Sequence, residues 1–243
     1  MLSAAITDRR EAAPGHFLLT LERPEGWSFR AGQFARLGLE IGGEPVFRAY
    51  SIASAPSDAG TLAFLIKAQP GGALSPRLTA LPPGSRVLID GPAQGSFSPG
   101  RIPGGRAIWL FATGPGLAPF LSLLREREAL GSWPEIRCVV GASLRSQSDA
   151  LAALAAEAGA GLPGFSVISA ASREPGPLSG RLTSLLESGE LERAAGRTAA
   201  REDDRVMLCG SEGFVAGMRA IFKARGIVSP RLGRPGQLLA ELL

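Results

Sequence analysis

The chain has 243 residues, 45% of them hydrophobic, and its 26 Lys and Arg against 22 Asp and Glu give a formal net charge of +4. This length suits one large or two modest domains, and the charge is spread over both halves of the chain, which excludes a basic tail for nucleic acid. One histidine and two distant cysteines, Cys138 and Cys209, exclude a cysteine-held metal cluster or a disulfide framework and indicate a reducing, cytoplasmic setting.

The first hundred residues show short strand patterns separated by Gly and Pro. The patterns fall at residues 17–21, 34–39, 46–52, 62–66 and 86–89, with a short helix at 75–81. Strands at this spacing predict an antiparallel β-barrel or sandwich. His16 precedes the first strand and is expected to be structural and half-exposed. Residues 98–105 are rich in Gly and Pro and are interpreted as a linker.

From residue 107 onward the rhythm changes to strand followed by helix. Strands are expected at 107–111, 137–140, 166–169 and 206–208, and helices at 117–130, 149–158, 181–186 and 213–224. This alternation is typical of a parallel α/β sheet that binds a nucleotide. The charged, Ala-rich segment 193–205 is interpreted as an exposed loop or frayed helix.

An uncharged stretch at 107–124 has the length of a membrane span, but Gly114, Pro115, Gly116 and Pro119 interrupt it. A buried parallel strand followed by a core-facing helix explains it better. The charges at residues 8–11 argue against a signal peptide, so neither export nor a membrane is expected.

Two short motifs carry chemistry. Arg48-Ala49-Tyr50-Ser51 places a guanidinium, the only Tyr and a hydroxyl on one strand pattern, which suits a flat, phosphate-bearing ligand and also an ordinary strand. In residues 111–120 a strand runs into the Gly-rich turn that holds Thr113, Gly114 and Gly116 and then into a helix. Such a turn lets a backbone approach a pyrophosphate closely, although any β–α turn can carry Gly.

Together, in this order, the two motifs resemble the ferredoxin–NADP reductase family, and in particular the bacterial ferredoxin or flavodoxin reductases. The resemblance continues through further segments at 72–78, 172–175, 180–183, 209–211 and 229–231, and so covers nearly the whole chain. It implies two domains: an antiparallel β-barrel that binds FAD at 1–100, followed by an α/β parallel-sheet domain that binds NADP at 105–243.

The resemblance also implies roles for residues on the FAD side. Arg48 would bind the pyrophosphate, Tyr50 would stack on the isoalloxazine, and Ser51 would hydrogen-bond near flavin N5, with Ala49 between them. The backbone of a second group would run beside the flavin: Leu65, Ile66 and Lys67. A third group would contact the FAD phosphates: Ala73, Leu74 and Ser75.

On the NADP side the implied roles depend on arginines, a residue type that numbers 24 in this chain, so that any one of them can also be an ordinary surface residue. Arg173 and Arg181 would grip the 2′-phosphate and Arg145 would join them. Other residues would face the pyrophosphate and nicotinamide: Thr113, Gly114, Gly116, Cys209, Gly210 and Ser211. Tyr50, Ser51 and Cys209 are the candidate catalytic residues, although Cys209 also suits a buried core thiol.

Three departures from the family pattern are visible. Pro115 replaces a Thr between the glycines and so removes an N–H, and Glu212 stands where Pro commonly follows the Cys-Gly pair. The chain stops at Leu243 without the aromatic tail of close relatives, from which we expect a more open flavin face.

The implied activity is that of a ferredoxin/flavodoxin–NADP(+) reductase, a monomeric oxidoreductase and flavoprotein. It would move hydride from NADPH to FAD and single electrons, reversibly, to ferredoxin or flavodoxin, an acidic electron carrier. Two alternatives remain: a flavin or ferric reductase or the reductase component of an oxygenase, and a non-catalytic flavoprotein subunit.

Overall fold

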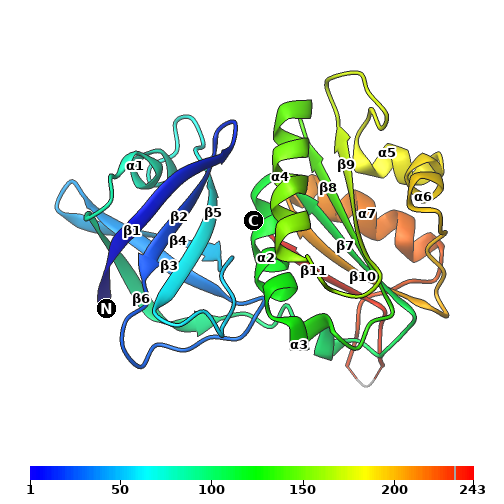
Figure 1. The fold of residues 1–243 in the computed structure, drawn as a ribbon, viewed down its shortest axis with the longest axis horizontal. Coiled ribbons are helices and arrows are strands. Elements are labelled where there is room, and N and C mark those ends of the chain that lie inside the picture. Colours follow the sequence, from blue (N-terminus) through cyan, green and yellow to red (C-terminus); the bar gives the residue numbers. More distant parts are fainter. Residues whose placement is uncertain (233) are drawn as a thin grey trace.

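Two β-sheets organise the chain, and the halves built around them lie side by side (Figure 1). The structure is a computed structural model that describes residues 1–232 and 234–243. The first sheet has six antiparallel strands and the second has five parallel strands. The fold class predicted from the sequence is therefore confirmed.

The first sheet has the strand order β4-β3-β6-β1-β2-β5. Its strands are β1 (Leu2–Ala13), β2 (His16–Glu22), β3 (Phe34–Ile41), β4 (Glu44–Ser51), β5 (Thr61–Lys67) and β6 (Arg86–Gln94), and α1 (Ser75–Ala80) follows β5. An antiparallel bridge between Ile52 and Phe64 brings the two edges of the sheet together, as in a barrel that is not fully closed. The sequence patterns missed β1, because Asp8, Arg9 and Arg10 interrupt its apolar positions.

The second sheet has the order β11-β10-β7-β8-β9, and all its neighbouring strands are parallel. The strands are β7 (Ala107–Thr113), β8 (Glu135–Ala142), β9 (Phe165–Ala171), β10 (Asp204–Gly210) and β11 (Leu238–Leu242). The segment 107–124 that could have crossed a membrane comprises β7, the 3-10 turn η2 (Gly114–Leu117) and most of α2. Within the described residues, no helix has the length and apolar character needed to cross a membrane.

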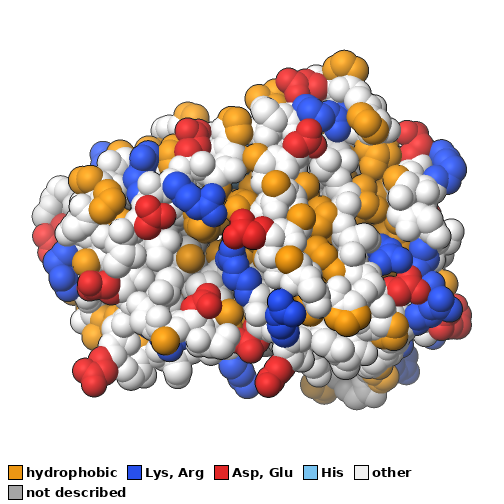
Figure 2. All heavy atoms as spheres, viewed as in Figure 1, with side chains coloured by type: hydrophobic (Ala, Val, Ile, Leu, Met, Phe, Trp, Pro, Cys, Tyr) orange, Lys and Arg blue, Asp and Glu red, His pale blue; other side chains and the backbone are white. Residues whose placement is uncertain are grey.

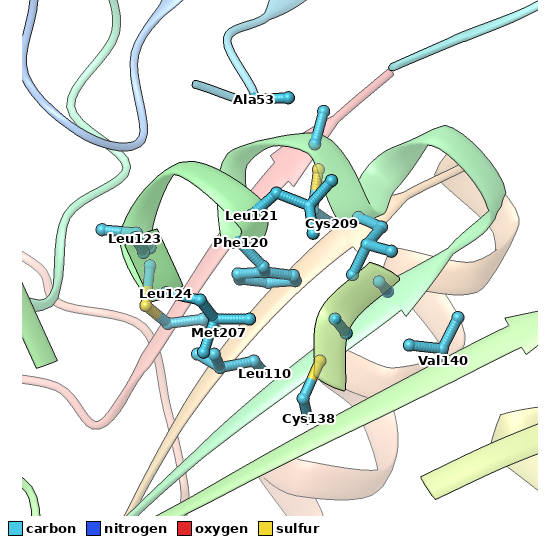
Figure 3. Close-up of a cluster of buried hydrophobic side chains, with 14 of the residues drawn as sticks. Ala53, Leu110, Phe120, Leu121, Leu123, Leu124, Cys138, Val140, Met207 and Cys209 are labelled. Carbon is cyan, nitrogen blue, oxygen red and sulfur yellow. The ribbon is translucent and has the colours of Figure 1, made fainter. Parts of the chain in front are cut away.

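Helices cover both faces of this sheet. On one face lie α2 (Ala118–Arg125), α3 (Arg127–Leu130) and α4 (Arg145–Ala158), and on the other lie α5 (Leu182–Glu187), α6 (Glu190–Ala195) and α7 (Glu212–Ala224). Side chains of β7 alternate between the faces: Leu110 packs in the cluster with Phe120 of α2 (Figure 3), whereas Phe111 packs against Phe222 of α7, with ring centroids 5.6 Å apart. The helix expected over 117–130 is broken at Glu126, whose ψ of 83° is not helical.

The segment 193–205 is less exposed than its composition indicated. Asp204 is fully buried, and its carboxylate accepts hydrogen bonds from Trp109 Nε1 at 3.1 Å and Arg197 Nε at 3.0 Å. Arg205 is also buried, and its guanidinium donates to the carbonyls of Pro103 and Gly104. The expectation of an exposed loop is wrong at this end, because these charges are paired inside the protein.

The two halves share an apolar contact and several hydrogen bonds. Phe97, in the loop after β6, packs on Phe120, with ring centroids 5.5 Å apart. Arg125 Nη1, at the end of α2, donates to the Ala53 carbonyl at 2.7 Å, and the Ser57 hydroxyl donates to the neighbouring Glu126 carboxylate at 3.1 Å. The residues at the junction are therefore held in fixed relative positions.

Candidate functional site

A cavity of about 670 Å³ opens where the carboxyl ends of the parallel strands face the first half. Ligands of open α/β sheets bind at this edge. The first half contributes His16 and Lys67, and the Gly-rich turn contributes Thr113, Gly114 and Pro115. Leu243 lines the cavity as well. The end of β8 and the loops and helix starts that follow β8, β9 and β10 provide the other lining residues: Gly141, Ala142, Ser143, Gln147, Ser172, Arg173, Gly180, Arg181, Leu182, Thr183, Ser211, Gly213 and Phe214.

The glycines of the turn allow two backbones to approach each other. A Cβ at Gly116 would overlap the carbonyl oxygen of Cys209, and a Cβ at Gly210 would overlap Oγ1 of Thr113. Gly114 has a φ of +52°, which favours glycine. Gly116 is thus needed for the contact between η2 and β10, and Gly210 for the contact between β10 and Thr113 at the end of β7. The interpretation as a pyrophosphate loop did not include these packing reasons.

Arg173 and Arg181, the residues expected to bind the 2′-phosphate, both border this cavity. Both are exposed, and neither forms an ion pair within residues 1–232 and 234–243. Arg181 is the residue before α5, and the Arg173 N–H donates to the Ser143 carbonyl at 3.0 Å, which fixes the loop after β9. Guanidinium groups without an ionic partner among the described residues are suited to bind a phosphate group.

Arg145 lies apart from these two arginines. Its Nη2 donates to the carbonyls of Leu178 at 3.1 Å and Pro175 at 3.4 Å, and its guanidinium packs where Gly176 has no side chain. It borders a second cavity of about 440 Å³ that also contains Arg193. The structure therefore does not bring all three arginines together.

On the first half, β4 presents the predicted Arg48-Ala49-Tyr50-Ser51 motif. The Arg48 guanidinium is exposed, and its only hydrogen bond within the described residues is to the neighbouring Phe47 carbonyl, at 2.7 Å. The Tyr50 ring is half-buried, and burial raises the pKa of its phenol to about 12, against a smaller opposite effect of Arg48. The motif thus offers a cation for phosphate beside a neutral aromatic ring.

The two remaining groups on this half differ in how they can contact a ligand. The side chains of Leu65 and Ile66 are buried, so only their backbone is available, at the edge of the sheet, whereas the Lys67 side chain is exposed and borders the cavity. Leu74 is buried as well, and the Ser75 hydroxyl accepts a hydrogen bond from the Gln69 N–H at 3.2 Å. Ala73 is exposed and lies in the loop that joins β5 to α1.

The sequence analysis missed Glu241, which lies where the two halves meet. Ser51 Oγ donates to Glu241 Oε1 at 3.0 Å, and Glu241 pairs in parallel register with Cys209. Burial raises the pKa of Glu241, and the hydrogen bond from Ser51 lowers it by less. The only signal in the sequence is an isolated acid in the apolar segment 238–243, and its partner is 190 residues away.

Cys209 is a buried thiol packed in the apolar cluster between α2 and the sheet (Figure 3). Burial raises its pKa well above the usual value, and the charge of Glu241 adds to this effect. The side chain therefore remains a neutral thiol and a poor nucleophile.

The arrangement combines three features around one junction. The first half presents a cation and a flat aromatic ring, the second presents a cavity with two unpaired guanidinium groups, and Ser51 and Glu241 form a hydrogen-bonded pair between them. An aromatic ring system with phosphates fits the first feature, and a nucleotide with an additional phosphate fits the second. The residues present therefore fit FAD and NADP.

Known proteins resemble this chain over most of its length. A family model described as an oxidoreductase FAD-binding domain matches residues 14–98. A ferredoxin–NADP reductase A from Sorangium cellulosum is 36% identical over 235 residues, which cover 93% of this chain and 84% of that protein. A flavodoxin/ferredoxin–NADP reductase from Escherichia coli is 39% identical over 202 residues, covering 82% of this chain and 80% of that protein.

Solved structures show the same likeness. A ferredoxin NADP⁺ reductase from Neisseria gonorrhoeae, with bound FAD and NADP, is 30% identical and superposes with a TM-score of 0.89, covering 99% of this chain and 98% of that one. A cytochrome P450 reductase from Amycolatopsis is 26% identical with a TM-score of 0.76, covering 99% of this chain and 69% of that one.

Proposed function

The chain belongs to the ferredoxin–NADP reductase family, and from this premise we propose that it is an FAD-dependent reductase that oxidises NADPH and delivers electrons to ferredoxin or flavodoxin. One observation carries the proposal. The cavity that holds Arg173 and Arg181 is lined from both halves of the chain, and the β4 motif of the first half is joined to the second half by the hydrogen bond from Ser51 to Glu241.

In this proposal, residues 1–100 form the FAD-binding domain. The Arg48 guanidinium holds the pyrophosphate as a fork of N–H donors, and the Tyr50 ring covers one face of the isoalloxazine. Because the Tyr50 pKa is about 12, the phenol is neutral at physiological pH and adds no charge beside the flavin. Backbone groups of Leu65, Ile66 and Lys67, at the sheet edge, and of the loop at 73–75 complete the site.

Residues 105–243 form the NADP-binding domain. Arg173 and Arg181 hold the 2′-phosphate, and Thr113, Gly114 and Ser211, which border the cavity, hold the pyrophosphate and nicotinamide end. Gly116 and Gly210 do not border the cavity and support these residues from behind. Arg145 is left out of this role, because loop carbonyls already bind its guanidinium. Glu212 begins α7 but does not border the cavity, so its charge does not oppose the phosphates from within the site.

Bound FAD would supply the redox chemistry, because a flavin accepts two electrons together from NADPH and releases them singly. The protein supplies orientation and proton control. Ser51 Oγ donates to Glu241, so the hydroxyl and the carboxyl can exchange a proton with a ligand atom placed against them. The neutral Cys209 thiol fills the end of β10 without adding charge.

The identity of the electron acceptor is the more specific part of the proposal. Lys and Arg side chains are interspersed with Asp and Glu on the face shown in Figure 2, so this face carries no single-sign patch that would select a partner by charge alone. The likeness to a cytochrome P450 reductase keeps a second candidate open, in which the same two domains reduce an oxygenase. We also propose that the protein acts as a monomer in the cytoplasm and that its reaction is reversible.

Anaerobic reduction separates these candidates. The purified protein is mixed with NADPH, the flavin absorbance is followed, and ferredoxin, flavodoxin, free flavin or ferric citrate is then added in separate runs. We expect fast bleaching by NADPH and fast reoxidation by ferredoxin or flavodoxin. Fast bleaching followed by reoxidation with free flavin or ferric citrate alone would identify the alternative reductase, and absence of bleaching would identify a non-catalytic flavoprotein.

A further inference from the structure

His16 is a buried polar residue that the proposed function leaves unused. It starts β2, is 1% exposed, and borders the cavity together with the Gly-rich turn. Its Nε2 is buried and has no hydrogen-bond partner within the described residues. A buried unpaired nitrogen is costly in a folded protein and calls for a partner that the described residues do not supply. The half-exposed structural role expected from the sequence does not explain this arrangement.

The hydrogen bond of the other ring nitrogen, Nδ1, determines which nitrogen of His16 carries the proton. Nδ1 lies 3.0 Å from the carbonyl oxygen of Pro14, which can only accept a hydrogen bond, so Nδ1 is the donor. The same carbonyl accepts from Gln147 Nε2 at 3.0 Å, which anchors this corner of the first half to α4. Burial, together with the positive charge of Lys67, lowers the pKa of His16 against smaller opposite effects of Pro14 and Glu11. The ring is therefore neutral at neutral pH, and Nε2 is a lone-pair acceptor.

On the side of the cavity, Nε2 faces the Gly-rich turn. A Cβ on Gly114 would lie 3.3 Å from Nε2, so the turn covers the buried nitrogen, and a ligand in the cavity meets Nε2 where the turn moves aside. NADP(H) offers two kinds of group near such a turn. The pyrophosphate oxygens are acceptors and repel a lone pair, whereas the hydroxyls of the nicotinamide ribose and the N–H groups of the carboxamide are donors. Only the donors match Nε2.

We infer that His16 Nε2 accepts a hydrogen bond from the nicotinamide riboside end of NADP(H), either from a ribose hydroxyl or from the carboxamide. His16 is thus a contact from the FAD-binding domain to the second cofactor, and it positions the nicotinamide end across the junction. The inference rests on the NADPH binding proposed above.

The single histidine allows a direct test on the unaltered protein. In ¹⁵N-labelled holoprotein at neutral pH, long-range ¹H–¹⁵N correlation spectra report the imidazole nitrogens without ambiguity. We expect the Nδ1–H form, and an upfield shift of the Nε2 resonance when NADP⁺ binds but none with 2′,5′-ADP, which lacks the nicotinamide riboside. An Nε2 resonance that saturating NADP⁺ leaves in place, or that both ligands shift alike, would overturn the inference.

Binding measurements on variants give a second test. For His16→Leu, isothermal titration should show NADP⁺ binding weakened about five- to tenfold and 2′,5′-ADP binding unchanged within about twofold. His16→Gln keeps an acceptor oxygen and should lie between Leu and wild type. Arg181→Ala should weaken both ligands. Thr20→Val, which removes a hydroxyl from the same strand away from the cavity, is the matched control and should weaken neither.

A third ligand, 2′-phospho-ADP-ribose, identifies the donor. It retains the ribose hydroxyls without the carboxamide, so weakened binding to His16→Leu assigns the contact to a hydroxyl, and unchanged binding assigns it to the carboxamide. If wild type and His16→Leu bind NADP⁺ equally well, the inference is wrong while the proposed function stands. If the wild type binds none of the three ligands, the proposed function fails and the inference with it.

Discussion

Tyr50 is the only tyrosine of the chain and sits beside the exposed Arg48 guanidinium on β4. Its ring is half-buried against the core of the first half, so one part is fixed and the rest is available to a ligand. Stacking on such a ring contributes about 0.5–1.5 kcal/mol beyond the area that it buries.

Tyr50→Ala is therefore expected to weaken FAD binding by about tenfold or more, because stacking and the exclusion of water are lost together. Tyr50→Phe keeps the ring and should bind FAD nearly as well as wild type. Fluorescence titration of the apoproteins with FAD measures both affinities. Equal FAD affinity of the Ala and Phe variants would show that the flavin does not lie on this ring.

The Glu241 carboxyl predicts a dependence of stability on pH. Its pKa is raised in the folded protein, so the folded state favours the protonated form. The corresponding stability is present in full below the pKa of the unfolded chain, and it is lost as the pH rises through the folded pKa. At neutral pH the buried carboxylate therefore costs stability.

Glu241→Gln mimics the protonated carboxyl and keeps an oxygen that accepts from Ser51 Oγ. We expect this variant to melt at a higher temperature than wild type near about pH 8 and at the same temperature near about pH 4, measured by circular dichroism. A variant that is less stable than wild type near pH 8 would mean that the carboxylate is stabilised by its surroundings.

At the scale of elements, the contact between η2 and the end of β10 positions the second cofactor site. Gly116 lies directly against the Cys209 carbonyl, and Gly210 lies against Thr113. A side chain at position 116 must push the turn away from β10, because the atoms that it meets belong to the backbone and cannot yield as a flexible side chain can, whereas at position 210 it meets the Thr113 side chain.

We predict that Gly116→Ala lowers the free energy of unfolding by about 1–3 kcal/mol, as for other overpacked sites. The matched control is Gly213→Ala in α7, where an added Cβ meets nothing within 4 Å and the change should be neutral or stabilise by up to about 1 kcal/mol. Urea denaturation compares the two. Equal stabilities would show that the turn shifts freely.

The elements visible in the sequence are those whose pattern is local. The strands β2 to β6 alternate or carry β-branched and aromatic residues between Gly and Pro, and the parallel strands β7 to β10 are apolar runs. β1 was missed because its charges hide the alternation, and β11 because Leu238–Leu242 has the length of either a strand or a frayed end. Both strands, β1 and β11, form by pairing with strands that are distant in the sequence.

The residues of the site also differ in whether a local sequence pattern reveals them. Arg173 and Arg181 follow recognisable strand and helix boundaries, so their convergence on one cavity was predictable. Glu241 was not, because its partner Ser51 is distant in sequence and only the assembled halves bring them together. Arg145 shows the reverse: its position after a strand indicated a ligand contact, yet nearby carbonyls bind its guanidinium.

For the whole molecule, function requires that the two halves keep their relative position. Arg125 donates to the Ala53 carbonyl across the junction, and burial lowers its pKa against the smaller raising effects of Asp58 and Glu157. A hydrogen bond from a charged group contributes about 1.5–3 kcal/mol, which is a large share of what holds two small domains together.

Arg125→Ala is expected to separate the unfolding of the two halves, so that calorimetry shows a broadened or double transition. Arg127→Ala is the control, because Arg127 Nη2 donates to the Ala160 carbonyl within the second half and should leave a single transition. If Arg125→Ala also melts as one sharp transition at the wild-type temperature, the apolar contact alone couples the halves.

The central claim is that the cavity bordered by Arg173 and Arg181 is the NADPH site. The measurement that tests it most directly is the ratio of kcat/KM for NADPH to kcat/KM for NADH in an anaerobic assay with an artificial acceptor. In the proposed site the arginines bind the 2′-phosphate, which is remote from the transferred hydride, so they would bind ground state and transition state alike and act on KM. Two charge-assisted contacts should favour NADPH by about a few hundredfold.

Arg173→Ala combined with Arg181→Ala should reduce that ratio to near one, mainly by raising KM for NADPH, and should leave bound FAD in place. Arg219→Ala, an exposed arginine of α7 outside the cavity, should keep the wild-type ratio. A double variant that retains the full preference for NADPH would contradict the account, because the 2′-phosphate would then bind elsewhere on the protein.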